Sequence, residues 1–151
     1  MLDDGIDLVR SLWEGQGSYD GKHYHYESGR MDLAAAARPV QNRIPLWVVG
    51  VWPSQRSMCR ALRCDGVIPQ YRLSGGTPAP DDASAVRTWL TGNGRGPDFD
   101  VIADGETLAD DRAAAQLEVA GWQQAGCTWW LETRWGVRKT SLTGSVRCGS
   151  A

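Results

Sequence analysis

The feature that most constrains this chain is an alternation of short apolar runs with segments of helical spacing. Runs that are apolar almost throughout are typical of strands buried on both faces of a parallel sheet. A repeated order of strand and helix predicts an α/β fold with right-handed crossovers. The expected strands are residues 46–49, 66–69, 99–103 and 127–131.

One helix is expected before the first of these strands and one between each pair of successive strands, because apolar residues recur at helical spacing there. The expected helices are residues 2–14, a helix opening at Pro53, one opening at Asp81 and Asp82, and residues 108–125. In the last helix we expect Ala113, Leu117 and Ala120 to face inward. Residues 18–45 read as irregular, with a turn at 19–22 and a short strand at 23–26.

The number of strand–helix units sets the expected architecture. Four such units make half of a (β/α)8 barrel, and a complete barrel needs roughly 250 residues. The chain has 151 residues. Its last part, residues 136–151, shows no apolar periodicity. We therefore expect a half-barrel domain over residues 1–135 and an irregular tail over 136–151.

Composition excludes several classes of protein. The chain is 42% apolar and 23% charged with a net charge of -2, close to an average globular protein. Lys and Arg are not clustered as nucleic-acid binding requires. No apolar run reaches the roughly 18 residues of a membrane span, and the N-terminus lacks the order of a signal peptide. We expect a cytoplasmic protein without a nucleic-acid or membrane partner.

The cysteines and histidines do not have the spacing of a metal site. Cys59, Cys64, Cys127 and Cys148 form no CxxC pair. Reduced cysteines of this kind pack as small hydrophobic residues. His23 and His25 could face one side of a strand, but no acidic or cysteine partner stands at ligand spacing. We expect no metal site.

Six segments, in order along the chain, carry a resemblance to a known family. They are 2–13 (LDDGIDLVRSLW), 19–24 (YDGKHY), 38–41 with 44–50 (RPVQ and IPLWVVG), 65–69 (DGVIP), 99–101 (FDV) and 126–132 (GCTWWLE). This series resembles the fourth helix and the fifth to eighth strands of luciferase-like monooxygenases, which are flavin-dependent oxidoreductases. The resemblance covers roughly residues 1–135.

The resemblance implies the C-terminal half of a (β/α)8 TIM barrel, truncated before strand five. It also implies FMN, or in some branches a 5-deazaflavin, used in reduced form for oxygenation or hydride transfer on a small organic substrate. Since the family's first four strands supply much of the flavin pocket, the chain is expected to be inactive alone. It would need a complementary N-terminal half or a homodimer of halves.

Two other functions stay open. The chain could be a non-catalytic half-barrel, either a remnant or a module that binds another protein through its open edges. A weaker alternative is a phosphate-binding half-barrel unrelated to flavins. An upstream segment with the first four strands would favour the oxidoreductase, and its absence would favour the non-catalytic module.

Candidate cofactor contacts lie at the carboxyl ends of two expected strands, where barrels place their chemistry. Gly50, Val51 and Trp52 precede a helix start, and a glycine there lets the backbone approach a phosphate. An ordinary strand-to-helix turn explains them equally well, and many family members have a second glycine in place of Val51. Glu132 could orient the cofactor or pair with an arginine such as Arg134. No catalytic residue is assigned.

Overall fold

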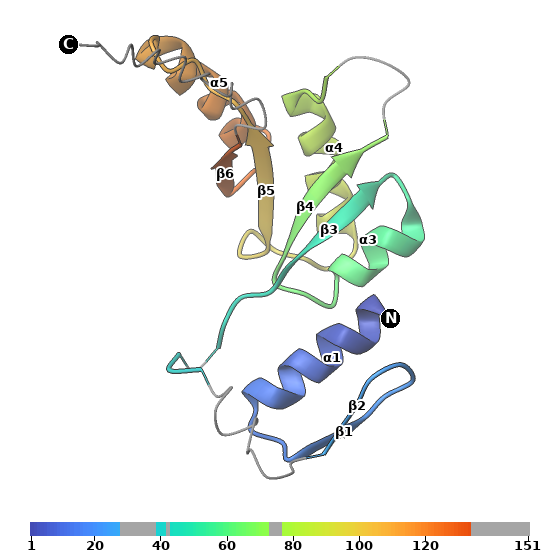
Figure 1. Cartoon of the computed structure of the whole chain (residues 1–151). Coiled ribbons are helices and arrows are strands. Elements are labelled where there is room, and N and C mark those ends of the chain that lie inside the picture. Colours follow the sequence, from blue (N-terminus) through green and yellow to red (C-terminus); the bar gives the residue numbers. More distant parts are fainter. Residues whose placement is uncertain (28–38, 42, 73–76, 134–151) are drawn as a thin grey trace, which may run out of the picture.

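A computed structural model describes residues 1–27, 39–41, 43–72 and 77–133 (Figure 1). The predictions for residues 136–151, for Arg134 and for Cys148 concern residues outside these ranges. The described elements are α1 (Leu2–Trp13), β1 (Ser18–Asp20), β2 (His25–Glu27), β3 (Trp47–Trp52), α3 (Gln55–Ala61), β4 (Gly66–Tyr71), α4 (Pro80–Gly92), β5 (Asp100–Gly105), α5 (Arg112–Gln124) and β6 (Trp129–Glu132).

The expected parallel sheet is present. Its strand order is β3-β4-β5-β6, the order of the sequence, and every neighbouring pair is parallel. The ladder between β3 and β4 runs from Trp47↔Gly66 to Trp52↔Tyr71, whereas β4 and β5 pair only at Gly66↔Asp100 and Val67↔Val101. The fold class is therefore confirmed as a mixed α/β fold with a four-stranded parallel sheet.

The core lies between one face of the sheet and the helices. Val48, Val67 and Val101 stand in register on adjacent strands and are buried together with residues from α3, α4 and α5. Strands added in sequence through right-handed crossovers place their helices on one side, which explains this arrangement. The buried helix residues include Met58, Ala61, Ala83, Val86, Leu90 and Trp122.

The opposite face, which we call the bare face, consists of the strand side chains that alternate with the core-facing ones. Its residues are Trp47, Val49 and Val51 of β3, Gly66, Ile68 and Gln70 of β4, Asp100, Ile102 and Asp104 of β5, and Trp129 and Leu131 of β6. Val49 and Trp129 keep 51% and 52% of their surface exposed. The described helices thus leave large apolar side chains of this face in contact with solvent.

Asp100 joins three strands at the amino-terminal edge of the bare face. Its carboxylate accepts hydrogen bonds from Trp47 Nε1 (3.0 Å), Trp129 Nε1 (3.2 Å) and Thr128 Oγ1 (2.8 Å). The two indole rings lie 5.3 Å apart between centroids. The indole N–H groups of Trp47 and Trp129 thereby both have an acceptor, which satisfies the polar group of each large ring.

A second junction, built on an arginine, lies on the helix side. Arg87 of α4 donates from Nε and Nη2 to the carbonyl oxygen of Gly126 (3.0 and 2.7 Å) and from Nη1 to that of Phe99 (3.0 Å). Burial lowers the pKa of its guanidinium. The charged fork therefore ties α4 to the segments that enter β5 and β6.

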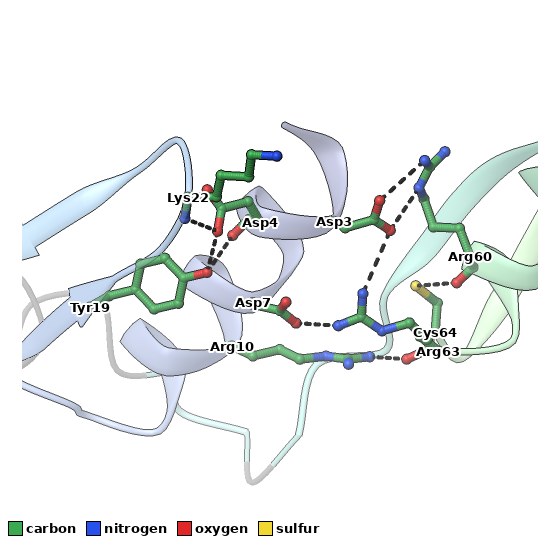
Figure 2. Close-up of polar contacts among 9 residues, drawn as sticks. All are labelled: Asp3, Asp4, Asp7, Arg10, Tyr19, Lys22, Arg60, Arg63 and Cys64. Carbon is green, nitrogen blue, oxygen red and sulfur yellow. Dashed lines mark hydrogen bonds and ion pairs between the residues drawn. The ribbon is translucent and has the colours of Figure 1, made fainter.

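Two sets of polar contacts fix α1 (Figure 2). On the side facing α3, Asp3 pairs with Arg60 (2.8 Å) and Asp7 with Arg63 (2.6 Å). On the other side, Asp4 accepts hydrogen bonds from the Tyr19 hydroxyl and from the turn between β1 and β2. These bonds connect the antiparallel β1–β2 hairpin to α1.

One expected helix face is wrong. In α5, Ala113 and Leu117 are exposed, Leu117 by 76%, while Trp122 is buried. The helix begins at Arg112, after Asp111 caps it by accepting from Ala114 N–H (2.9 Å). With alanine at 113, 114 and 115, apolar spacing alone does not select the face, and Trp122 decides it. Within the described residues, no helix has the length and apolar character needed to cross a membrane.

Candidate functional site

The carboxyl ends of the four parallel strands form the edge at which ligands bind in barrels and in open α/β sheets. In this chain that edge contains the last residues of β3, β4, β5 and β6 and the loops that follow them. All four residues predicted to contact a cofactor lie within two residues of the ends of β3 and β6. The packing and hydrogen bonds of each residue determine whether it has a group left to contact a ligand.

Gly50 faces the helices and not the bare face. A Cβ built on Gly50 would lie 2.7 Å from Val67 Cγ2 and 2.9 Å from Met58 Sδ. Such separations are shorter than real Cβ contacts allow, so a side chain would push α3 away from the sheet. The glycine is explained by close packing of β3 against α3.

Val51 and Trp52 end β3 just before the turn into α3, and the polar groups of Val51 are engaged within the chain. The Val51 N–H donates to Ser57 Oγ (2.9 Å), and the Val51 carbonyl accepts from Ser54 N–H (2.9 Å). The Trp52 ring meets the Trp89 ring edge-on at 6.2 Å, and a cis peptide bond links Trp52 to Pro53. The alternative of a strand-to-helix turn therefore accounts for this segment.

Glu132 holds the loop after β5 against the end of β6. Its carboxylate oxygens accept from the N–H and the hydroxyl of Thr107, both at 2.9 Å, and from Trp130 Nε1 at 3.1 Å. Trp130 packs on the helix side, where its ring lies 6.2 Å from that of Trp122. Glu132 thus acts as a positioning residue for the rim of the sheet.

The side chains that reach the bare face near the carboxyl edge are Val51, Gln70, Asp104 and Leu131. Gln70 and Asp104 are exposed, and the two apolar residues are half-buried. Of these four, only Val51 was among the residues predicted to contact a cofactor. Strand alternation could have found the others, but a nearly continuous apolar strand does not reveal which side chains face the helices.

The buried titratable groups of the sheet serve packing. Burial raises the pKa of the Cys127 thiol to about 11, and burial also raises the pKa of Tyr71. Both groups therefore stay protonated at neutral pH, and Cys127 is not a nucleophile there. Cys64 is likewise buried, with a raised pKa, whereas Cys59 is exposed.

The histidine pair belongs to the β1–β2 hairpin, which is separate from the four-stranded sheet. His25 Nδ1 contacts Asp20 Oδ1 across the β1–β2 hairpin. Among the described residues, no three His, Cys, Asp or Glu side chains gather as metal ligands. Comparisons with protein-family models, curated proteins and solved structures found no match to this chain.

Proposed function

We propose that this chain forms four strands of a (β/α)8 wall and functions within a flavin-dependent oxidoreductase of the luciferase-like type. A complementary N-terminal half or a second copy would supply the other four strands. The substrate would be a small organic molecule, oxidised by oxygenation or by hydride transfer. Outside its complete barrel the chain would be inactive.

The observation that carries this proposal is the one-sided packing of a sheet whose strand order follows the sequence. In a doubly wound sheet, helices cover both faces, whereas a barrel wall has helices outside and strand side chains inside. Here α3, α4 and α5 bury their apolar residues against one face. The opposite face presents Val49 and Trp129, which suits the interior of a barrel.

The described residues fit a flavin only in part. FMN requires a wall for its ring and donors for its phosphate. Val51 and Leu131 offer an apolar wall on the bare face, but the N–H of Val51 already donates to Ser57 Oγ. Gly50 opens no space toward a ligand. We therefore assign this chain the wall alone, and no step of flavin chemistry to its residues.

One observation favours a second function, the non-catalytic half-barrel. The polar groups of Val51 and Glu132 that could meet a cofactor make hydrogen bonds within the chain. A module that only contributes strands to another protein needs no such groups. The two functions differ in whether the isolated, folded chain retains any affinity for flavin.

Titration of FMN with the purified chain, followed by flavin fluorescence, separates these functions. We expect saturable quenching at micromolar concentrations, with reduced 5-deazaflavin as a parallel ligand. Val51→Glu should weaken binding about tenfold or more, because it places a negative charge against the ring wall. Absence of binding by a chain that is folded by circular dichroism would favour the non-catalytic half-barrel.

Leu117→Glu is the matched control for that substitution. Leu117 lies on the outer side of α5 and is 76% exposed, so the same negative charge is added away from the bare face. FMN affinity should stay unchanged in this variant. Equal loss of affinity in the two variants would show that added negative charge, and not the bare face, governs flavin binding.

A further inference from the structure

A cavity of about 640 Å³ lies between the end of α1 and the segment that leads into β3. Its walls include Arg10 and Trp13 of α1, Arg43 and Ile44 of the approach to β3, and Arg63 after α3. This volume falls in the range of small-molecule pockets. The cavity adjoins the amino-terminal ends of the strands, opposite to the edge considered above.

The arginines of this cavity differ in how their charges are balanced. Arg43 pairs with Asp65, and Arg63 pairs with Asp7 at 2.6 Å and with Asp3 at 3.6 Å. Arg10 donates from Nη2 to the carbonyl oxygen of Arg63 at 2.5 Å. Within the described part of the chain, Arg10 has no carboxylate at ion-pair distance.

The two carboxylates one helical turn away from Arg10 on either side, Asp7 and Glu14, bond to other residues. Glu14 lies one turn after Arg10 and also lines the cavity, but its Oε2 accepts from Gln16 Nε2 at 3.0 Å. An arginine guanidinium is always charged and has five N–H donors in a fixed fork. The bond to the Arg63 carbonyl orients this fork (Figure 2). Among the residues that the structure describes, no second acceptor lies at hydrogen-bond distance from the other N–H groups of Arg10.

We propose that this cavity binds a small organic carboxylate. The carboxylate would receive two parallel hydrogen bonds from Arg10, which is the geometry that guanidinium and carboxylate groups prefer. Trp13 and Ile44 would contact the apolar body of the ligand. One negative charge suffices, since Arg43 and Arg63 already have carboxylate partners.

Benzoate is the probe that matches these walls, and benzamide is its uncharged analogue of equal shape. Isothermal titration of the full chain should show saturable benzoate binding, with benzamide at least about tenfold weaker. Arg10→Gln should weaken benzoate binding about tenfold or more, because it removes the charged fork. Arg56→Gln, an exposed arginine of α3 outside the cavity, should bind benzoate as the unchanged chain does.

A second measurement covers the case in which Arg10→Gln disturbs folding. In the unchanged chain, benzoate should shift the side-chain Nε–H resonance of Arg10 in an NMR titration, and the Arg56 resonance should not move. Equal affinity for benzoate and benzamide, benzoate binding retained in a folded Arg10→Gln variant, an unmoved Arg10 resonance, or no benzoate binding would each overturn the proposal.

Discussion

Gly50 and Val51 are neighbours in β3, and their positions face opposite sides of the sheet. The absent side chain of Gly50 leaves room for Met58 and Val67, whereas Val51 faces away from α3. The sequence could place both residues at the end of a strand. It could not separate their roles, because a glycine needed for packing and a glycine needed for a phosphate look the same in one sequence.

Gly50→Ala tests the packing role. We expect a loss of about 1–3 kcal/mol in the free energy of unfolding, since the new Cβ would overlap Val67 Cγ2 and Met58 Sδ. Urea denaturation measures the change. Gly92→Ala is the control, because nothing lies within 4 Å of its Cβ position, and it should leave stability unchanged or raise it slightly. Equal stability of Gly50→Ala and the unchanged chain would contradict the packing role.

At the scale of elements, the apolar runs predicted all four strands of the parallel sheet and the helices around them. Each strand extends further toward its carboxyl end than the run that predicted it, because Trp52, Tyr71, Gly105 and Glu132 pair through their backbones. The hairpin strand β1 was not expected. The turn expected at residues 19–22 overlaps β1, and residue spacing does not reveal the contacts that attach the hairpin to α1.

Asp4 is the residue that attaches the hairpin. Its carboxylate accepts from the Tyr19 hydroxyl (2.7 Å) and from the N–H groups of Lys22 (3.2 Å), His23 (2.5 Å) and Tyr24 (3.0 Å). The hydrogen bond from Tyr19, together with those from the turn, lowers the pKa of Asp4 to about 2. The same contact raises the pKa of Tyr19 to about 12.

These values give the hairpin a defined pH dependence. A carboxyl group with a lowered pKa stabilises the folded form when it is ionised, so its contribution is complete above pH 4 and declines as the pH falls toward 2. NMR resonances of the His23 and Tyr24 amides should therefore move between pH 4 and pH 2. In Asp4→Asn this acid transition should be absent, whereas Asp98→Asn, an exposed carboxyl group elsewhere, should retain it.

At the scale of the molecule, helices cover one face of the sheet, whereas on the other face the described residues leave Val49 and Trp129 exposed, although Ile102 there is fully buried. The order of strand and helix predicted the first property, because right-handed crossovers fix the side on which helices lie. The short apolar runs that predicted the strands could not show which of their side chains remain exposed. Val49 and Trp129 lie within apolar runs that suggested burial on both faces, yet half of each surface is accessible.

An exposed apolar face of this kind should promote association. We expect sedimentation velocity to show an apparent mass that rises with concentration. Val49→Lys should reduce the rise, since it places a charge at an exposed apolar position of the bare face, and Leu117→Lys should not, although Leu117 is more exposed. A monomer at every concentration, or equal effects of the two substitutions, would contradict association through this face.

The short ladder between β4 and β5 divides the parallel sheet into two strand–helix–strand units. One unit contains β3, α3 and β4, and the other contains β5, α5 and β6. Only two residue pairs connect the strands of the two units. Side chains of α4 also connect them: Val86 and Leu90 lie in the core, and Arg87 bonds to the Phe99 carbonyl just before β5. An interface between the two units that consists mostly of side-chain contacts can be altered by substitution without breaking a backbone ladder. We therefore expect that replacing one whole unit, by recombination or by design, is tolerated better at the boundary between β4 and β5 than within either unit.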